Sequence, residues 1–452
     1  MWGMSKTYRP WNVDQALLLP PSVQELVPAG HLAHFVRDLV RDSLDLSAIL
    51  DDYPEERGYP PYHPVMMTAL LLYSYCQGVY SSRRMAAACE QRVDFMAVTA
   101  LQKPDFRTIS EFRRRHLPAL GALFAQVLLL CEQAGLVKLG HVALDGTKIK
   151  ANASKHKAMS YGRMKQREAE LAAEVRKWLE QAELADAAED DSLGKQRRGD
   201  ELPEWVQSKQ KRLEKMRTAM EALEAEAAAE AQAAQPAECD PPPDDEGSQA
   251  AAPAPDGQTP PSAPPPRDKA QRNFTDPESR IMKTPSGFEQ AYNAQAAVDA
   301  ESQVIVAEGL TNAGNDKQQV VPLAEEIERN LGRAPRELSA DSGYCSEANL
   351  GELVQRGIRG YVATGRQKHG TAAATGKGTG EHVRGMSRRL RQGGHRSRYR
   401  LRKQTVEPVF GQIKSARGFR QFQLRGLAKV ADEWRLVCLA HNLLKLAKRF
   451  AP

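Results

Sequence analysis

The stretch HVALDGTKIKANAS, residues 141–154, decides the fold class of this chain. Its apolar start has the composition of a buried strand, Asp145 and Gly146 form a pair common in turns, and the residues after them favour a second short strand. The stretch therefore predicts a strand that ends at an acid, then a turn and another strand. Helical patterns precede it, and strand patterns return only at Asn273.

Residues 1–138 predict an all-helical N-terminal domain. Residues 63–80 and 84–101 are apolar stretches of helical length. Thr108 and Glu111 fit a capping box that would begin a further helix. Either this helix, or a pair of helices broken near Pro118, would run to about Gly135. The arginines on that helix suit either DNA binding or the charged rim of a plain bundle, and composition leaves both open.

Residues 155–234 predict a helical hairpin inserted after the first strands. Two apolar stripes at helical spacing indicate its arms, and the second repeats at the 3-4 spacing of a coiled-coil seam. The stripes are Met164, Leu171, Val175, Trp178, Ala182 and Leu213, Met216, Met220, Leu223, Ala227. The following segment, residues 235–272, is predicted to be a disordered linker, because residues 235–268 hold 11 of the 28 prolines.

The rest of the chain alternates between strand and helix patterns. We expect a hairpin of strands at residues 289–299 and 303–310, and later strands at 336–341 and 360–364. Helices are expected at 316–331 and after a cap at Ser346, and a Gly- and Arg-rich loop at 365–397. This order favours an α/β fold in which a mixed sheet is covered by helices.

Charge and composition narrow the function. The chain has a net charge of +6, yet residues 384–403 carry nine basic residues and no acid, while acids gather between residues 168 and 246. Such a basic run favours a polyanion such as nucleic acid over a solvated loop. Six scattered cysteines without a C-x-x-C pair exclude a zinc ribbon, and we expect reduced thiols that are mostly buried. We expect no membrane span and no signal peptide, and so a cytoplasmic protein.

Three acids stand out by position. Asp145 and Asp341 are expected to end apolar strands, and Glu407 lies in TVEPVFGQIK beside the basic run. Acids at strand ends meet at one edge of a sheet, and crowded carboxylates call for hard cations such as Mg²⁺ or Mn²⁺. Singly, each acid is as easily a turn or cap residue. Asp276, Asp299 and Asp316 occupy less favourable positions and are left out, and the lone histidines His141, His395 and His441 are expected to be structural.

These stretches resemble a DDE transposase of bacterial insertion sequences. The resemblance rests on residues 141–154, on TDPESRIMKT, AYNAQAAVD and LSADSGYCSE, and on VEPVFGQIKSARGFRQFQLRG, in that order. Residues 62–98 also resemble the helical domain of such proteins. The resemblance implies a ribonuclease-H-like catalytic domain, formed by residues 139–154 and 273–452, with Asp145, Asp341 and Glu407 as catalytic metal ligands and two Mg²⁺ or Mn²⁺ ions.

The family signature around the third acid is Tyr, two residues, Arg, three residues, Glu, six residues, Lys. Glu407 and Lys414 keep its spacing, but Arg400 stands where Tyr is expected and Lys403 where Arg is expected. Tyr399 and Arg402 lie one residue too early. By the resemblance, Lys414, Lys403, Arg400 and Arg402 are DNA-binding residues. Since the residue before proline avoids helical angles, Pro408 predicts a helix that begins near Glu407.

The resemblance implies an enzyme that cuts the ends of an insertion sequence and transfers them into target DNA. Its partner would be double-stranded DNA, both transposon ends and target, held by a homo-oligomer in the nucleoid. The N-terminal helical domain would bind the ends. Two alternatives stay open: a nuclease of the same fold without strand transfer, and a non-catalytic DNA-binding derivative of a transposase.

Overall fold

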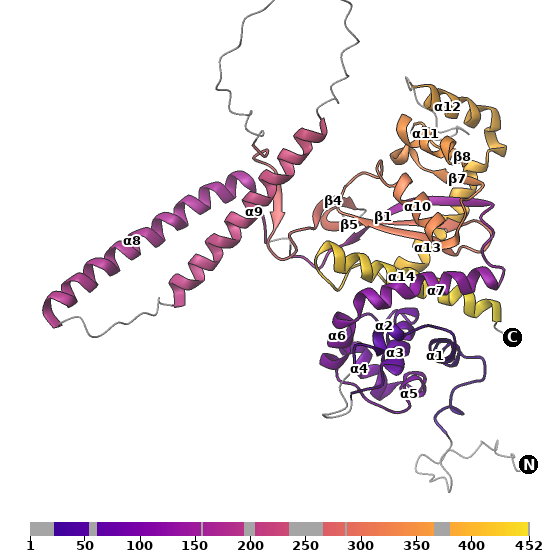
Figure 1. The fold of residues 1–452 in the computed structure, drawn as a ribbon, viewed down its shortest axis with the longest axis horizontal. Coiled ribbons are helices and arrows are strands. Elements are labelled where there is room, and N and C mark those ends of the chain that lie inside the picture. Colours follow the sequence, from indigo (N-terminus) through magenta and orange to yellow (C-terminus); the bar gives the residue numbers. More distant parts are fainter. Residues whose placement is uncertain are drawn as a thin grey trace, which may run out of the picture.

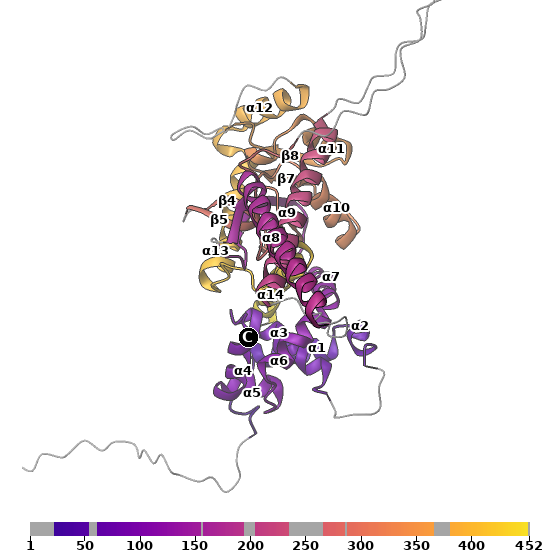
Figure 2. The same ribbon diagram turned by 90° about the vertical axis from the view of Figure 1, so that its left-hand side faces the viewer.

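The computed structural model describes residues 22–53, 61–154, 157–193, 204–234, 265–284, 287–365 and 380–450. A mixed sheet lies between two groups of helices, and a long helical hairpin projects to one side (Figure 1). Turned by 90°, the N-terminal helices still lie at one end of the molecule and α11 and α12 at the other (Figure 2). The predicted linker, apart from residues 265–272, lies outside the described residues.

The described part of the N-terminal region forms seven helices. They are α1 (Leu32–Asp42), α2 (Ser47–Leu50), α3 (Pro64–Cys76), α4 (Ser82–Gln91), α5 (Val93–Thr99), α6 (Phe106–Arg115) and α7 (Leu117–Gln133). The expected break near Pro118 is confirmed by the 71° bend between α6 and α7. The predicted capping box is wrong: Asp105 caps α6, and its carboxylate accepts from the backbone of Arg107 and Thr108. An acid one turn earlier reaches those free N–H groups first.

The central sheet has six strands. They are β1 (His141–Lys150), β4 (Arg280–Thr284), β5 (Gly287–Asp299), β6 (Ile305–Thr311), β7 (Glu337–Ala340) and β8 (Arg359–Val362). β5 pairs antiparallel with β1 on one side, and with β4 and then β6 on the other. β1, β7 and β8 run parallel. The predicted mixed sheet and its β5–β6 hairpin are therefore confirmed.

Helices cover and extend this sheet. They are α10 (Val320–Leu331), α11 (Glu347–Gln355), α12 (Glu381–Gly393), α13 (Leu401–Gly411) and α14 (Leu427–Phe450). Ser346 caps α11 as predicted. The loop expected at residues 365–397 is wrong for its second half, because α12 forms there. Met386 and Leu390, one turn apart, bury their side chains and fix it as an amphipathic helix.

One hydrophobic core joins the N-terminal helices to the sheet. α14 packs against α7 and α3 on one side and β6 on the other (Figure 1). The same cluster of buried residues runs from Leu70 and Phe124 through Val142 to Trp434. Among the described residues no single helix is long and apolar enough to cross a membrane, and only the bent pair α6 and α7 reaches that length together.

The inserted segment forms α8 (Tyr161–Leu193) and α9 (Glu204–Ala234), which pack against each other. A two-stranded sheet, β2 (Ala158–Ser160) and β3 (Gln271–Asn273), ties its base together. Regular structure therefore returns two residues before the predicted Asn273, because β2 provides a partner strand. The predicted seam residues Met164, Met216 and Leu223 are buried there.

Candidate active site

Asp145 lies in the middle of β1. The prediction of a strand, a turn and a second strand is wrong. The segment is one continuous strand, because β5 pairs with β1 from Val142 to Lys150 without a break. Gly146 allows close packing instead of forming a turn: a Cβ on it would collide with Gln295 Nε2 and would lie 2.8 Å from Asp316 Oδ1. The side chain of Asp145 is 18% exposed, so it opens to solvent from within the sheet.

Asp341 follows the last residue of β7, as predicted. β7 is the parallel neighbour of β1, with Ala143 opposite Ser339. Asp145 and Asp341 each follow this pair by two residues, and the charge of Asp341 acts on Asp145. The Asp341 carboxylate accepts from the backbone N–H of Gly343 at 2.8 Å, which holds it at the turn after the strand.

Asp316, excluded by the sequence analysis, also belongs to this group. It lies in the loop before α10, which begins at Val320 and not at the predicted Asp316. Its Oδ1 accepts from Asn293 Nδ2 at 2.6 Å and Gln295 Nε2 at 2.7 Å, and Lys148 Nζ lies 3.6 Å away. Two buried amides on alternate residues of an otherwise apolar strand were the signal for this contact.

Burial opposes the ionisation of Asp145. Burial raises its pKa to about 6, the negative charges of Asp341 and Asp316 add to the shift, and the Arg402 guanidinium counteracts it. Three acids from β1, β7 and the loop before α10 thus share one electrostatic environment. Such a group favours a cation.

Glu407 lies inside α13, and the helix start predicted there is wrong. α13 begins at Leu401 and runs through Pro408. Proline cannot donate to the carbonyl of Gln404, four residues earlier. Gln303 Nε2 donates to that carbonyl instead, at 3.1 Å. This tertiary contact satisfies the carbonyl that a proline leaves without a helical partner.

Arg402 connects the acids. Its Nη1 donates to Asp145 Oδ2 at 2.6 Å, and its Nη2 lies 3.5 Å from Glu407 Oε1. Tyr399 hydrogen-bonds with Arg402 and is half-buried, whereas Arg400 and Lys403 are exposed. The Tyr and Arg that lie one residue too early for the signature are therefore the pair that faces the acids.

Lys414 lies in a π-helical turn, Gln412–Ala416, directly after α13. Its ammonium donates to Thr147 Oγ1 at 2.6 Å and to the carbonyl of Lys148 at 2.7 Å. Burial lowers its pKa, and the positive charges of Arg420 and Lys148 lower it further. Lys414 is therefore anchored on β1 two residues beyond Asp145, and is not a freely solvated charge.

The chemistry of the donors suits a hard cation, but their arrangement here is a salt bridge. Within the described ranges no three His, Cys, Asp or Glu side chains are gathered as metal ligands. The Arg402 guanidinium lies between Asp145 and Glu407 and neutralises both. For Asp145 and Glu407 to hold a metal ion, Arg402 would have to move away from Asp145.

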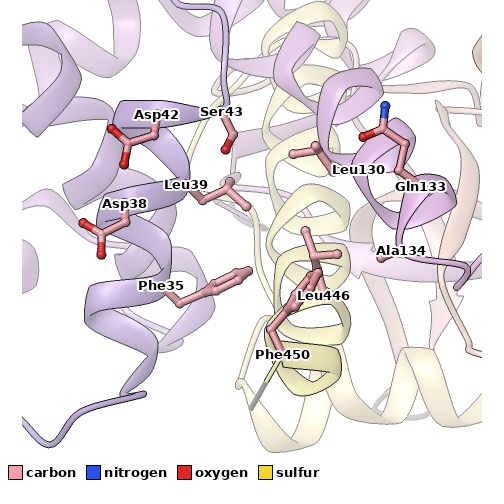
Figure 3. A pocket seen from close by; sticks show the side chains of 10 residues that line it. All are labelled: Phe35, Asp38, Leu39, Asp42, Ser43, Leu130, Gln133, Ala134, Leu446 and Phe450. Atoms are coloured by element: carbon pink, nitrogen blue, oxygen red, sulfur yellow. The ribbon is translucent and has the colours of Figure 1, made fainter. Parts of the chain in front are cut away.

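An apolar pocket of about 590 Å³ lies elsewhere, between α1, α7 and α14 (Figure 3). Phe35, Leu446 and Phe450 point into it, and Asp38 and Asp42 lie on its α1 side. Its lining includes none of the predicted site residues. Its acidic side does not suit DNA.

The described cysteines and lone histidines, which the sequence analysis did not assign to a site, lie in the core or in structural contacts. Cys76, Cys89, Cys131 and Cys438 are buried free thiols, as expected. His441 is buried, its Nε2 is bonded to the carbonyl of Gln303, and burial lowers its pKa to about 3. His141 is held between Glu337 and Ser339. The side chain of His395 and Cys239 lie outside the described residues.

Two family models match the chain. Residues 21–115 match a Transposase domain (DUF772), and residues 259–443 match a Transposase DDE domain. Comparison with curated proteins and with solved structures gave no significant match. Asp145 lies outside both matched ranges, but β1 pairs directly with β5 of the matched part. Together the two models cover more than half of the chain, in the order expected from its motifs: the chain belongs to the DDE transposases of insertion sequences.

Proposed function

We propose that this transposase cuts DNA at the ends of an insertion sequence and transfers the ends into target DNA, using divalent metal ions. The observation that carries the proposal is the group of Asp145, Asp341 and Glu407, from β1, the end of β7 and α13. The strand order β6-β5-β1-β7-β8, antiparallel on one side of β1 and parallel on the other, supports a ribonuclease-H-like fold.

In this proposal Asp145, Asp341 and Glu407 hold two Mg²⁺ or Mn²⁺ ions. Bound ions would polarise the scissile phosphodiester and lower the pKa of the attacking water. Asp316 keeps its hydrogen bonds from Asn293 and Gln295, and its carboxylate adds negative charge beside the three acids. In the second step the freed 3′-hydroxyl attacks a target phosphodiester, so one P–O bond forms as another breaks and no protein–DNA bond is made.

Arg402, Lys414, Lys403 and Arg400 are proposed to contact the phosphates. Arg402 contacts Asp145 and Lys414 contacts Thr147, so both side chains reach β1 close to the first acid. Arg400 and Lys403 are exposed on the same segment, where they can meet a neighbouring phosphate. We propose further that the N-terminal helices bind the transposon ends. We also propose that a homo-oligomer holds the DNA in the nucleoid.

The test replaces each acid by its amide. We expect Asp145→Asn, Asp341→Asn and Glu407→Gln to lose cleavage and joining by a factor of 10² or more, on the order of one lost catalytic electrostatic contact, while DNA binding persists. Glu301→Gln, an exposed carboxylate in the β5–β6 turn, is the control. A variant that retains near-normal Mg²⁺-dependent cleavage removes its residue from the site.

A second assay separates the proposed function from its alternatives. A duplex with a pre-cut end is incubated with supercoiled target and Mg²⁺, and joined product is measured. Cleavage without joining would favour a nuclease of the same fold. Neither reaction, with intact DNA binding, would favour a non-catalytic DNA-binding derivative.

A further inference from the structure

A basic groove of about 900 Å³ lies at the base of the inserted hairpin. It is lined from α9, from the β2–β3 strands and from the loop before α14. Its eleven lining residues include five cations and no acid. The cations are Lys157, Lys211, Arg212, Lys215 and Arg425.

The groove uses one face of α9. Ser208, Lys211, Arg212, Lys215 and Met216 follow at spacings i, i+3, i+4, i+7 and i+8, so they lie together on the helix surface. Met216 is buried beneath them, and Met159 and Phe274 also line the groove. The apolar side chains form its floor and the exposed ammonium and guanidinium groups its rim.

Neighbouring cations on α9 behave differently. Lys209 pairs with Glu174 of α8 at 2.6 Å, and Arg217 pairs with Glu168 of α8 at 2.8 Å. Within the described part of the chain, none of the five groove cations forms a salt bridge with a carboxylate. Arg425 donates to the carbonyl and to the side-chain oxygen of Asn152. The groove therefore keeps its positive charge available.

The groove is connected to the candidate active site along β1. The segment after α13 follows this strand: Lys414 binds at Thr147, the carbonyl of Arg420 accepts from Lys150 N, and Arg425 binds Asn152. Asn152 lies seven residues beyond Asp145, about 23 Å of extended chain. That distance corresponds to about seven base pairs of B-DNA.

We propose that the hairpin insertion is a second DNA-binding element, whose groove holds the phosphodiester backbone about seven base pairs from the scissile phosphate. The proposal rests on the proposed DNA substrate and adds a role for the hairpin. A row of cations without acids suits phosphates, since each neutralised phosphate releases a counterion. Lys414, Arg420 and Arg425 continue this positive track between the two sites.

Two charge-matched variants of the full chain test the proposal. Lys211→Gln/Arg212→Gln removes two groove cations, and Lys209→Gln/Arg217→Gln removes two cations paired with α8. Binding to a labelled 30-base-pair duplex is measured without divalent metal at several salt concentrations. We expect the groove variant to lower the slope of log K against log salt by about two, and the affinity roughly tenfold or more at 0.1 M salt. The paired variant should keep the wild-type slope.

The outcomes separate this proposal from the proposed function. An unchanged slope in the groove variant, or an equal change in both variants, overturns the groove while metal-dependent cleavage stands. If the groove variant lowers the salt slope but the wild-type protein never cleaves DNA, the proposed cleavage is overturned and the proposed groove stands. A wild-type chain that binds no duplex overturns both. Lys211→Arg/Arg212→Lys, which keeps the charge, should restore the wild-type slope.

Discussion

The sheet and the inserted hairpin are stabilised in different ways. The sheet shares one core with α14 and the N-terminal helices, so distant segments depend on each other. The hairpin has a separate cluster of four buried residues, Tyr161, Met164, Ala219 and Leu223, and otherwise relies on pairing between α8 and α9 and on ion pairs. The shared core therefore holds the sheet that carries the acids in a fixed position. The sequence of the hairpin can change without disturbing that core.

The largest effect is expected where the two halves of the core meet. Trp434 is fully buried on α14, and its indole N–H donates to the carbonyl of Gln295 at 2.9 Å. Trp434→Ala should lower the free energy of unfolding by about 3–5 kcal/mol, because it leaves a cavity and an unpaired carbonyl. Chemical denaturation measures this, with exposed Phe288→Ala as the control. A loss under about 1 kcal/mol would mean that α14 does not join the core.

A second effect comes from a buried acid of the same helix. Burial raises the pKa of Glu433 to about 7, against bonds from the backbone of Gln423 and Leu424 and the charge of Arg113. Between pH 4.5 and about 7 the folded chain therefore holds a proton that the unfolded chain has lost. Stability should fall as pH rises through this window, by up to about 3 kcal/mol.

Glu433→Gln isolates that contribution. The variant cannot ionise at this position, so its free energy of unfolding should fall less between pH 4.5 and about 7 than that of the wild type. Denaturation midpoints across this pH range measure the difference. Parallel pH profiles for the two proteins would show that Glu433 does not titrate there.

The smallest effect on global stability is expected in the hairpin. Met164 is fully buried, but only within the cluster of four residues. Met164→Ala should loosen the α8–α9 base by about 2 kcal/mol and leave the main unfolding transition in place. Hydrogen exchange should show faster exchange confined to α8 and α9. Leu70→Ala, in the shared core, should shift the main transition; equal shifts in both variants would make the hairpin part of one cooperative unit.

Local patterns in the sequence determined much of this protein. Helical stripes predicted α8 and α9, strand composition with a tight turn predicted the β5–β6 hairpin, and Ser346 predicted the cap of α11. Ordered motifs were sufficient to predict the family, and Asp341 at the end of β7. These features depend on residues close together in the chain, so a single sequence contains their physical cause.

Only the tertiary structure decided which side chains meet. It kept β1 straight through Asp145 and Gly146, because β5 pairs along its length. It let α13 run through Pro408, because Gln303 satisfies the carbonyl that proline leaves free. In the folded chain Asp316 lies close enough to Asp145 for their charges to interact, and Arg402 donates to Asp145. For β1, Pro408 and Arg402 the deciding partner lies over a hundred residues away, and Asp316 is held by Asn293 and Gln295 of the preceding strand pair, 23 and 21 residues away. Local propensity contains no record of these contacts.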